Sequence, residues 1–164
     1  MKDVPEYRDK PVLIFGCGNI LFGDDGFGPA VANELMKSYN IPDFVGVIDA
    51  GTSVREFLFN IALDEIKPIK IIIIDAVDVG KKPGEIFEID LDELPEKKID
   101  DFSMHQLPTS NLLRELRDLA DVEITILSCQ VDGLPESVKL GLSDTLTGKV
   151  KEMCDIIVKN HFKS

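Results

Sequence analysis

The stretch Val12–Leu35, VLIFGCGNILFGDDGFGPAVANEL, contains the pattern of a strand, a glycine-rich loop and a helix. Its first residues, Val12–Phe15, form a short apolar run ended by glycine, which is typical of a strand buried on both faces. Pro29 suits the first turn of the helix, where a backbone N–H has no partner to lose. Asp24 and Asp25 lie in the loop, where a nucleotide-binding turn would receive phosphate. The stretch predicts the first β–α unit of an α/β fold, with an unusual pair of carboxylates.

The alternation of strands and helices continues along the chain. Apolar runs predict buried strands near residues 45–48, 70–75 and 122–129, and amphipathic patterns predict helices over 53–63, 111–120 and 144–160. The segment 84–91 alternates polar and apolar residues, which indicates a half-exposed strand at a sheet edge. On the last predicted helix, one face carries Leu146, Val150, Met153, Ile157 and Val158. We therefore predict one domain spanning residues 1–164, a three-layer α/β/α sandwich with a mainly parallel, twisted sheet.

The composition narrows the class of protein. The chain has 164 residues and a formal net charge of −12, which argues against a nucleic-acid surface because phosphate backbones require clustered Lys and Arg. Its three cysteines have no framework spacing, and its longest apolar runs are too short to cross a membrane. The first ten residues are polar and contain no signal-peptide core. We predict a cytoplasmic protein without nucleic-acid or membrane partners.

Acidic side chains are predicted to gather at one edge of the sheet. In open parallel sheets, ligands bind beyond the carboxyl ends of the strands. Asp24 and Asp25 follow the first predicted strand, and Asp49 and Asp75 end the second and third. His105 lies in the loop before the third helix. Any one of these aspartates could cap a helix or accept hydrogen bonds from loop amides, but together they form a candidate site.

The residue types favour a cation at this edge. Carboxylates that converge repel each other unless a cation compensates their charge. Two carboxylates and one imidazole form an incomplete ligand set that zinc, nickel and iron accept, with positions left for water or substrate. The sequence has no HExxH motif, so a zinc protease site on one helix is excluded.

Two alternative hypotheses for the glycine loop have less support than a cation site. A dinucleotide fingerprint requires a third glycine where this chain has Leu21, and the carboxylate pair would repel a pyrophosphate. A non-enzymatic, metal- or phosphate-dependent receiver-like regulatory domain would also use an acidic pair and an aspartate ending the third strand around Mg²⁺. However, the pair lies well beyond the strand end, the nearest lysine to the last strand is Lys139, and His105 would have no role.

Five motifs occur in an order that resembles one protein family. They are GCGNILFGDDGFGP (16–29), DAGT (49–52), IIIIDAVDVG (71–80), SMHQLPTSNLL (103–113) and GLPESVKLGLS (133–143). Together they resemble the hydrogenase maturation endopeptidases over nearly the whole chain. Within that family, the sequences of the first and fourth motifs are most similar to those of enzymes that serve coenzyme F420-reducing hydrogenases.

The resemblance implies a function and a site. It implies a nickel-dependent endopeptidase that removes a C-terminal peptide from the large-subunit precursor of a nickel–iron hydrogenase, after nickel has been inserted in that precursor. It also implies that Asp25, Asp75 and His105 contact the metal, which the substrate presents and which this protein need not hold permanently. Asp49 would be a secondary polar residue near the cleft. Cys17, within the glycine motif, is expected to pack rather than to act as a nucleophile.

Overall fold

A computed structural model describes residues 7–93 and 109–163, which form one five-stranded sheet in the order β2-β1-β3-β5-β4. The strands are β1 (Val12–Cys17), β2 (Val45–Gly51), β3 (Lys70–Val77), β4 (Ile86–Ile89) and β5 (Glu123–Gln130). The helices are α1 (Phe27–Ser38), α2 (Val54–Leu63), α3 (Thr109–Ala120) and α4 (Asp144–His161), with short 3₁₀ turns η1 (Gly23–Gly26) and η2 (Leu91–Glu93).

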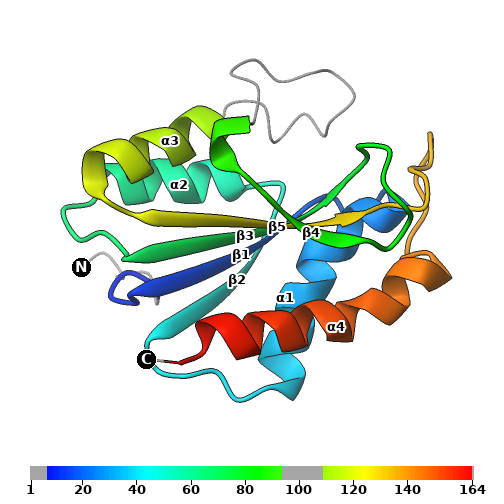
Figure 1. The fold of residues 1–164 in the computed structure, drawn as a ribbon, viewed down its shortest axis with the longest axis horizontal. Coiled ribbons are helices and arrows are strands. Elements are labelled where there is room, and N and C mark those ends of the chain that lie inside the picture. Colours follow the sequence, from blue (N-terminus) through cyan, green and yellow to red (C-terminus); the bar gives the residue numbers. More distant parts are fainter. Residues whose placement is uncertain (1–6, 94–108, 164) are drawn as a thin grey trace.

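The helices cover both faces of the sheet. Figure 1 shows α1 and α4 on one face and α2 and α3 on the other. Strands β1, β2, β3 and β5 are parallel, and β4 pairs with β5 in the antiparallel direction at the edge. The prediction of a three-layer α/β/α sandwich with a mainly parallel sheet is confirmed.

The isoleucine run of β3 explains why this strand lies in the middle of the sheet. Ile71 and Ile73 pack into the apolar core beneath α2 and α3, whereas Ile72 and Ile74 pack into the core beneath α1 and α4. All four are at most 5% exposed. Consecutive side chains of a strand point to opposite faces of the sheet. A strand that is buried on both faces therefore needs apolar side chains at every position.

Strand β4 lies at the sheet edge, as its alternating sequence predicts. Its four residues are partly buried or exposed, and it pairs with β5 alone. The position of β5 between β3 and an antiparallel β4 differs from the all-parallel 2-1-3-4-5 order of doubly wound receiver domains. The receiver-like alternative therefore has no support in the strand order.

Helix α4 packs its apolar face into the core, as predicted. Leu146, Met153 and Ile157 are fully buried, and Val150 and Val158 are partly buried against the same cluster. Within the described residues, no helix is long and apolar enough to cross a bilayer.

One local prediction differs from the structure. Strand β3 does not end at Asp75 but continues to Val77, because β5 keeps pairing with it as far as the Val77–Gln130 pair.

Candidate active site

Glycines allow the first loop and helix to lie directly against the strands. A Cβ atom on Gly28 would lie 2.3 Å from the Cys17 carbonyl oxygen and 2.4 Å from that of Ile74. Gly18 has a φ angle of +143°, and a Cβ there would lie 1.9 Å from the Asp25 carbonyl oxygen. Any side chain at either position would push η1 and α1 away from the sheet. The glycines thus set the position of the carboxylates.

Asp25 is held close to the carboxyl ends of the strands. Its side chain is 5% exposed, and its Oδ2 accepts a hydrogen bond of 2.8 Å from the backbone N–H of Asn19. The turn that carries it, η1, contacts β3. The structure therefore brings the element bearing Asp25 against the strand bearing Asp75.

Asp75 lies two residues inside the end of β3. It is 7% exposed, and its Oδ1 accepts a hydrogen bond of 2.9 Å from the N–H of Ala76. Its register partner on β5 is Ser128, whose hydroxyl is buried and has no hydrogen-bond partner in the described structure. Partners in register on parallel strands point to the same face, so this carboxylate and this hydroxyl share the α2–α3 side of the sheet.

Asp24, although adjacent to Asp25, has a different environment. It is 2% exposed, and its two oxygens accept three hydrogen bonds. The donors are the backbone N–H of Asp132 (2.9 Å), the backbone N–H of Ser143 (2.7 Å) and the Ser143 hydroxyl (2.9 Å). Asp24 joins η1 to the start of α4, so the two carboxylates of the pair have separate tasks.

Cys17 follows Gly16 at the end of β1 and is 1% exposed. Burial raises the pKa of its thiol well above the ordinary value, and the negative charges of Asp75 and Asp49 raise it further. A thiol that remains protonated is a poor nucleophile. This environment supports the expectation that Cys17 has a packing role.

Asp49 is exposed, in contrast to Asp24, Asp25 and Asp75. Its Oδ2 accepts a hydrogen bond of 2.9 Å from the Asn33 side chain, which also donates to the Pro29 carbonyl. Asp49 thereby ties the end of β2 to α1. Its charge reaches the Cys17 thiol, which places it near the edge of the predicted site.

Gln130 is a residue of this edge that the sequence analysis did not single out. It is 3% exposed, and its Oε1 accepts hydrogen bonds from the N–H groups of Val79 (3.0 Å) and Lys81 (3.1 Å). Its Nε2 donates to the Asp78 carboxylate at 3.0 Å. It therefore shapes the loop between β3 and β4. A glutamine that directly follows a run of mostly apolar residues was the available signal.

His105, the third predicted metal contact, lies outside the described residues. Within residues 7–93 and 109–163, no three His, Cys, Asp or Glu side chains form a group that could hold a metal ion. The assignment of Asp25, Asp75 and His105 as a metal-contacting set stays a prediction.

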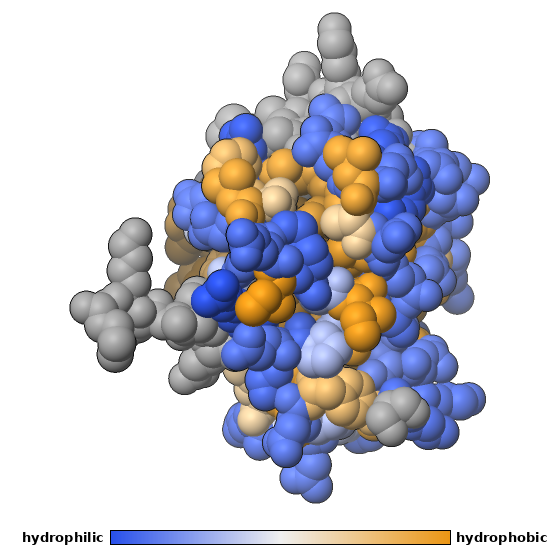
Figure 2. Space-filling model, turned by 90° about the vertical axis from the view of Figure 1, so that its left-hand side faces the viewer, coloured by the Kyte–Doolittle hydropathy of each residue, from blue (hydrophilic) through white to orange (hydrophobic). Residues whose placement is uncertain are grey.

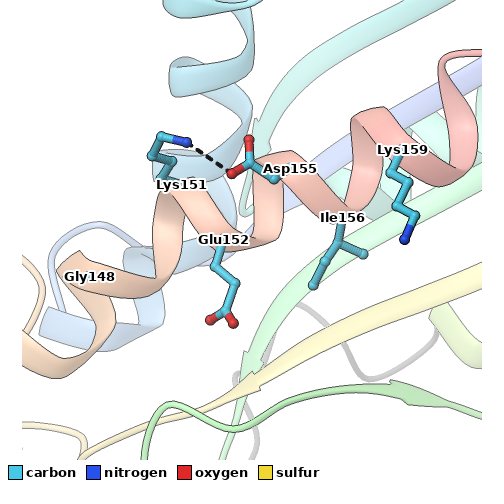
Figure 3. Close-up of a pocket in the computed structure, with 6 residues that line it drawn as sticks. All are labelled: Gly148, Lys151, Glu152, Asp155, Ile156 and Lys159. Carbon is cyan, nitrogen blue, oxygen red and sulfur yellow. Dashed lines mark hydrogen bonds and ion pairs between the residues drawn. The ribbon is translucent and has the colours of Figure 1, made fainter.

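A hollow of about 520 Å³ lies along α4 and contains none of these residues. Its lining comes from this one helix: Gly148, Lys151, Glu152, Asp155, Ile156 and Lys159. Figure 3 shows Lys151 and Asp155 paired beside it, with their atoms 2.9 Å apart. A groove along one exposed, charged helix face offers no convergent chemistry, so we do not assign it a catalytic role.

Fold and site together define an α/β protein with acidic groups at the carboxyl edge of a parallel sheet. The sequence profile of the hydrogenase maturation proteases matches residues 29–160. The chain belongs to this family, whose members are peptide hydrolases, and the resemblance inferred from the sequence motifs is confirmed.

Individual relatives agree with this assignment. A Methanocaldococcus jannaschii protein that carries the provisional name of a hydrogenase maturation protease is 41% identical over 92% of this chain and 96% of its own length. The coenzyme F420 hydrogenase subunit delta of Methanothermobacter thermautotrophicus is 34% identical over 92% of this chain and 94% of its own. The hydrogenase maturating endopeptidase HybD of Escherichia coli matches in structure with a TM-score of 0.72, at 27% identity over 90% of each chain.

Proposed function

We propose that this protein is a nickel-dependent endopeptidase that removes a C-terminal peptide from the large-subunit precursor of a nickel–iron hydrogenase. Nickel is part of the substrate in this proposal, since the precursor carries it before cleavage. The family match supports the reaction class. The similarity to a coenzyme F420 hydrogenase subunit supports a hydrogenase of that type as the partner. Residues 1–164 then form one maturation protease domain.

The observation that carries the proposal is the placement of two carboxylates. Asp25 and Asp75 are both nearly buried, and the turn that bears the first contacts the strand that bears the second. Carboxylate oxygens, with the imidazole of His105, are donors that nickel accepts. A precursor with nickel gains coordination to these groups, whereas a precursor without nickel does not. The same residues therefore distinguish the two forms of the substrate.

Hydrolysis follows from the fixed position of the precursor. Water adds its oxygen to the carbonyl carbon of the scissile bond, the C–N bond breaks, and the leaving nitrogen takes up a proton. Asp25 and Asp75 anchor the substrate so that this bond lies in a constant orientation. Holding the reactants in place can lower the activation free energy, by on the order of 7–11 kcal/mol in the best cases. Bound nickel can add Lewis acidity at the carbonyl.

Intact-mass spectrometry tests this function. A purified large-subunit precursor, with and without nickel, is incubated with the protein. We expect the nickel-loaded precursor to lose one defined C-terminal peptide and the nickel-free precursor to keep its full mass. Equal cleavage of both forms would contradict nickel recognition, and no cleavage of verified nickel-loaded precursors would contradict the proposed activity.

A further inference from the structure

Two loops beside the candidate site expose large apolar side chains. Ile20 and Leu21, between β1 and η1, are 58% and 44% exposed. Val138 and Leu140, between β5 and α4, are 62% and 71% exposed. We call these four residues the apolar edge. Apolar side chains that gather in one place, unlike single scattered ones, indicate an interaction surface.

Backbone hydrogen bonds hold the two loops side by side. The N–H of Lys139 donates to the Leu21 carbonyl, and the N–H of Gly23 donates to the Lys139 carbonyl, each at 2.8 Å. Phe22 and Lys139 form a parallel β-bridge. Side chains alternate along paired extended segments. Leu21 and the two apolar residues that flank Lys139 therefore share the side opposite to Phe22.

The outer edge of this pairing is open. Both backbone groups of Lys139 point toward the first loop, so those of Val138 and Leu140 point away from it. Neither Val138 nor Leu140 takes part in any backbone hydrogen bond of the described structure. An edge with free N–H and C=O groups is a template for an added strand.

The edge is also rigid, which lowers the entropy lost on binding. Asp24 accepts hydrogen bonds from Asp132 and Ser143, which lie at the two ends of the loop that carries Val138 and Leu140. Pro135 packs on Gly23, where a Cβ atom would lie 3.1 Å from its Cδ.

The apolar edge continues directly into the candidate site. Asn19, whose N–H binds the Asp25 carboxylate, immediately precedes Ile20. The first loop therefore joins the apolar edge to the candidate site.

We propose that Val138 and Leu140 bind an extended apolar segment of the polypeptide substrate as an added strand. This proposal rests on the proposed function and names the docking surface for its substrate. Backbone hydrogen bonds would supply affinity, and apolar side chains at alternate substrate positions would pack against Val138 and Leu140. A second copy of this chain is a less suitable occupant, because each copy carries a net charge of −12.

Charged substitutions test the side-chain contacts. We expect V138D and L140D to lower kcat/KM for the nickel-loaded large-subunit precursor at least about tenfold, through KM, with kcat at saturation unchanged. The matched controls are L63D and L119D, at positions 70% and 84% exposed near the opposite end of the strands. Figure 2 shows that end, where apolar side chains also reach the surface. The controls should process the precursor like the wild type.

Hydrogen exchange tests the added strand in the wild type. We expect the amides of Val138 and Leu140, which donate no backbone hydrogen bond in the free protein, to exchange at least about tenfold more slowly with the bound precursor. Cleavage by the wild type with unchanged exchange and unchanged kinetics of V138D and L140D would overturn the docking proposal alone. If the wild type neither cleaves nor binds the precursor, the proposed function is overturned as well. A homodimer in sedimentation that L140D dissociates would identify a second copy as the occupant and overturn the proposal.

Discussion

Asp24 accepts hydrogen bonds from both the backbone N–H and the hydroxyl of Ser143, at 2.7 and 2.9 Å. Ser143 is the N-cap of α4, and its hydroxyl in turn accepts a bond from the N–H of Leu146. One buried carboxylate thus fixes the start of the last helix relative to the first loop, although the two segments are far apart in sequence. Its neighbour Asp25 instead accepts a hydrogen bond from the N–H of Asn19 within the first loop.

The structural role of Asp24 predicts a large loss of stability when its carboxylate is removed. D24A leaves the partly buried N–H of Ser143 without its acceptor and removes two further hydrogen bonds, so we expect the free energy of unfolding to fall by about 2–3 kcal/mol. Urea unfolding measures this change. D49A is the matched control, because Asp49 is exposed and accepts a single described hydrogen bond, and it should cost less than about 1 kcal/mol. Equal effects of the two substitutions would contradict the assigned role.

A pair of glycine substitutions should have opposite effects on stability. G28A places a Cβ atom 2.3 Å from the Cys17 carbonyl oxygen, so we expect either loss of folding or destabilisation by more than about 3 kcal/mol. G148A lies within α4 with no atom within 4 Å of the new Cβ. It should raise the free energy of unfolding by about 0.5–1 kcal/mol, since alanine is the better helix former. In thermal unfolding, each kcal/mol would shift the Tm by about 2–4 °C for a chain of this size. A tolerated G28A would show that α1 can move away from the sheet.

The spacing of apolar residues predicts most of this fold, because each strand or helix has clearly buried and clearly exposed faces. The continuous apolar run of β3 and the alternating run of β4 distinguish a central from an edge strand, as the structure confirms. The end of β3 could not be read from Asp75, because pairing with β5 rather than the local sequence sets it. The placement of β5 between β3 and β4 likewise depends on contacts distant in sequence.

The candidate site was less predictable than the fold. The residue pattern placed Asp24 and Asp25 together, and only the family resemblance singled out Asp25. The structural role of Asp24 could not be predicted, because its donors lie more than a hundred residues away. Gln130 was missed for a similar reason: its hydrogen bonds to Val79 and Lys81 form only once β3 and β5 are paired. Polar residues acquire their roles from tertiary neighbours, whereas apolar periodicity is visible locally.

The buried thiols predict a loss of stability at high pH. Burial raises the pKa of both Cys129 and Cys154 to about 12, from an ordinary value of 9.0. The unfolded chain therefore ionises first, so their contribution is complete below pH 9 and is lost as pH rises from about 9 to 12. Each thiol contributes at most about 1.4 kcal/mol per pH unit. Urea unfolding at pH 8 and 10 should show the loss, and C154A should reduce its slope. The same slope in both proteins would contradict this origin.

Substitutions at the predicted metal contacts should separate activity from folding. D25N and D75N keep an oxygen that can accept the backbone hydrogen bonds from Asn19 and Ala76 but remove the negative charge. We expect both to lower processing of a nickel-loaded precursor by more than about a hundredfold while urea midpoints stay close to that of the wild type.

His105 completes this prediction. H105A should abolish processing in a protein that remains folded, because the imidazole is the only nitrogen donor of the predicted set. H161A is the control: His161 is partly buried near Lys70 at the end of α4, far along the chain from the predicted set, and its removal should leave processing intact. Intact-mass spectrometry of the precursor and circular dichroism of each variant give the two readouts. If D25N, D75N or H105A unfolds, that residue is structural; if all three stay folded and cleave normally, the metal-contacting set is wrong.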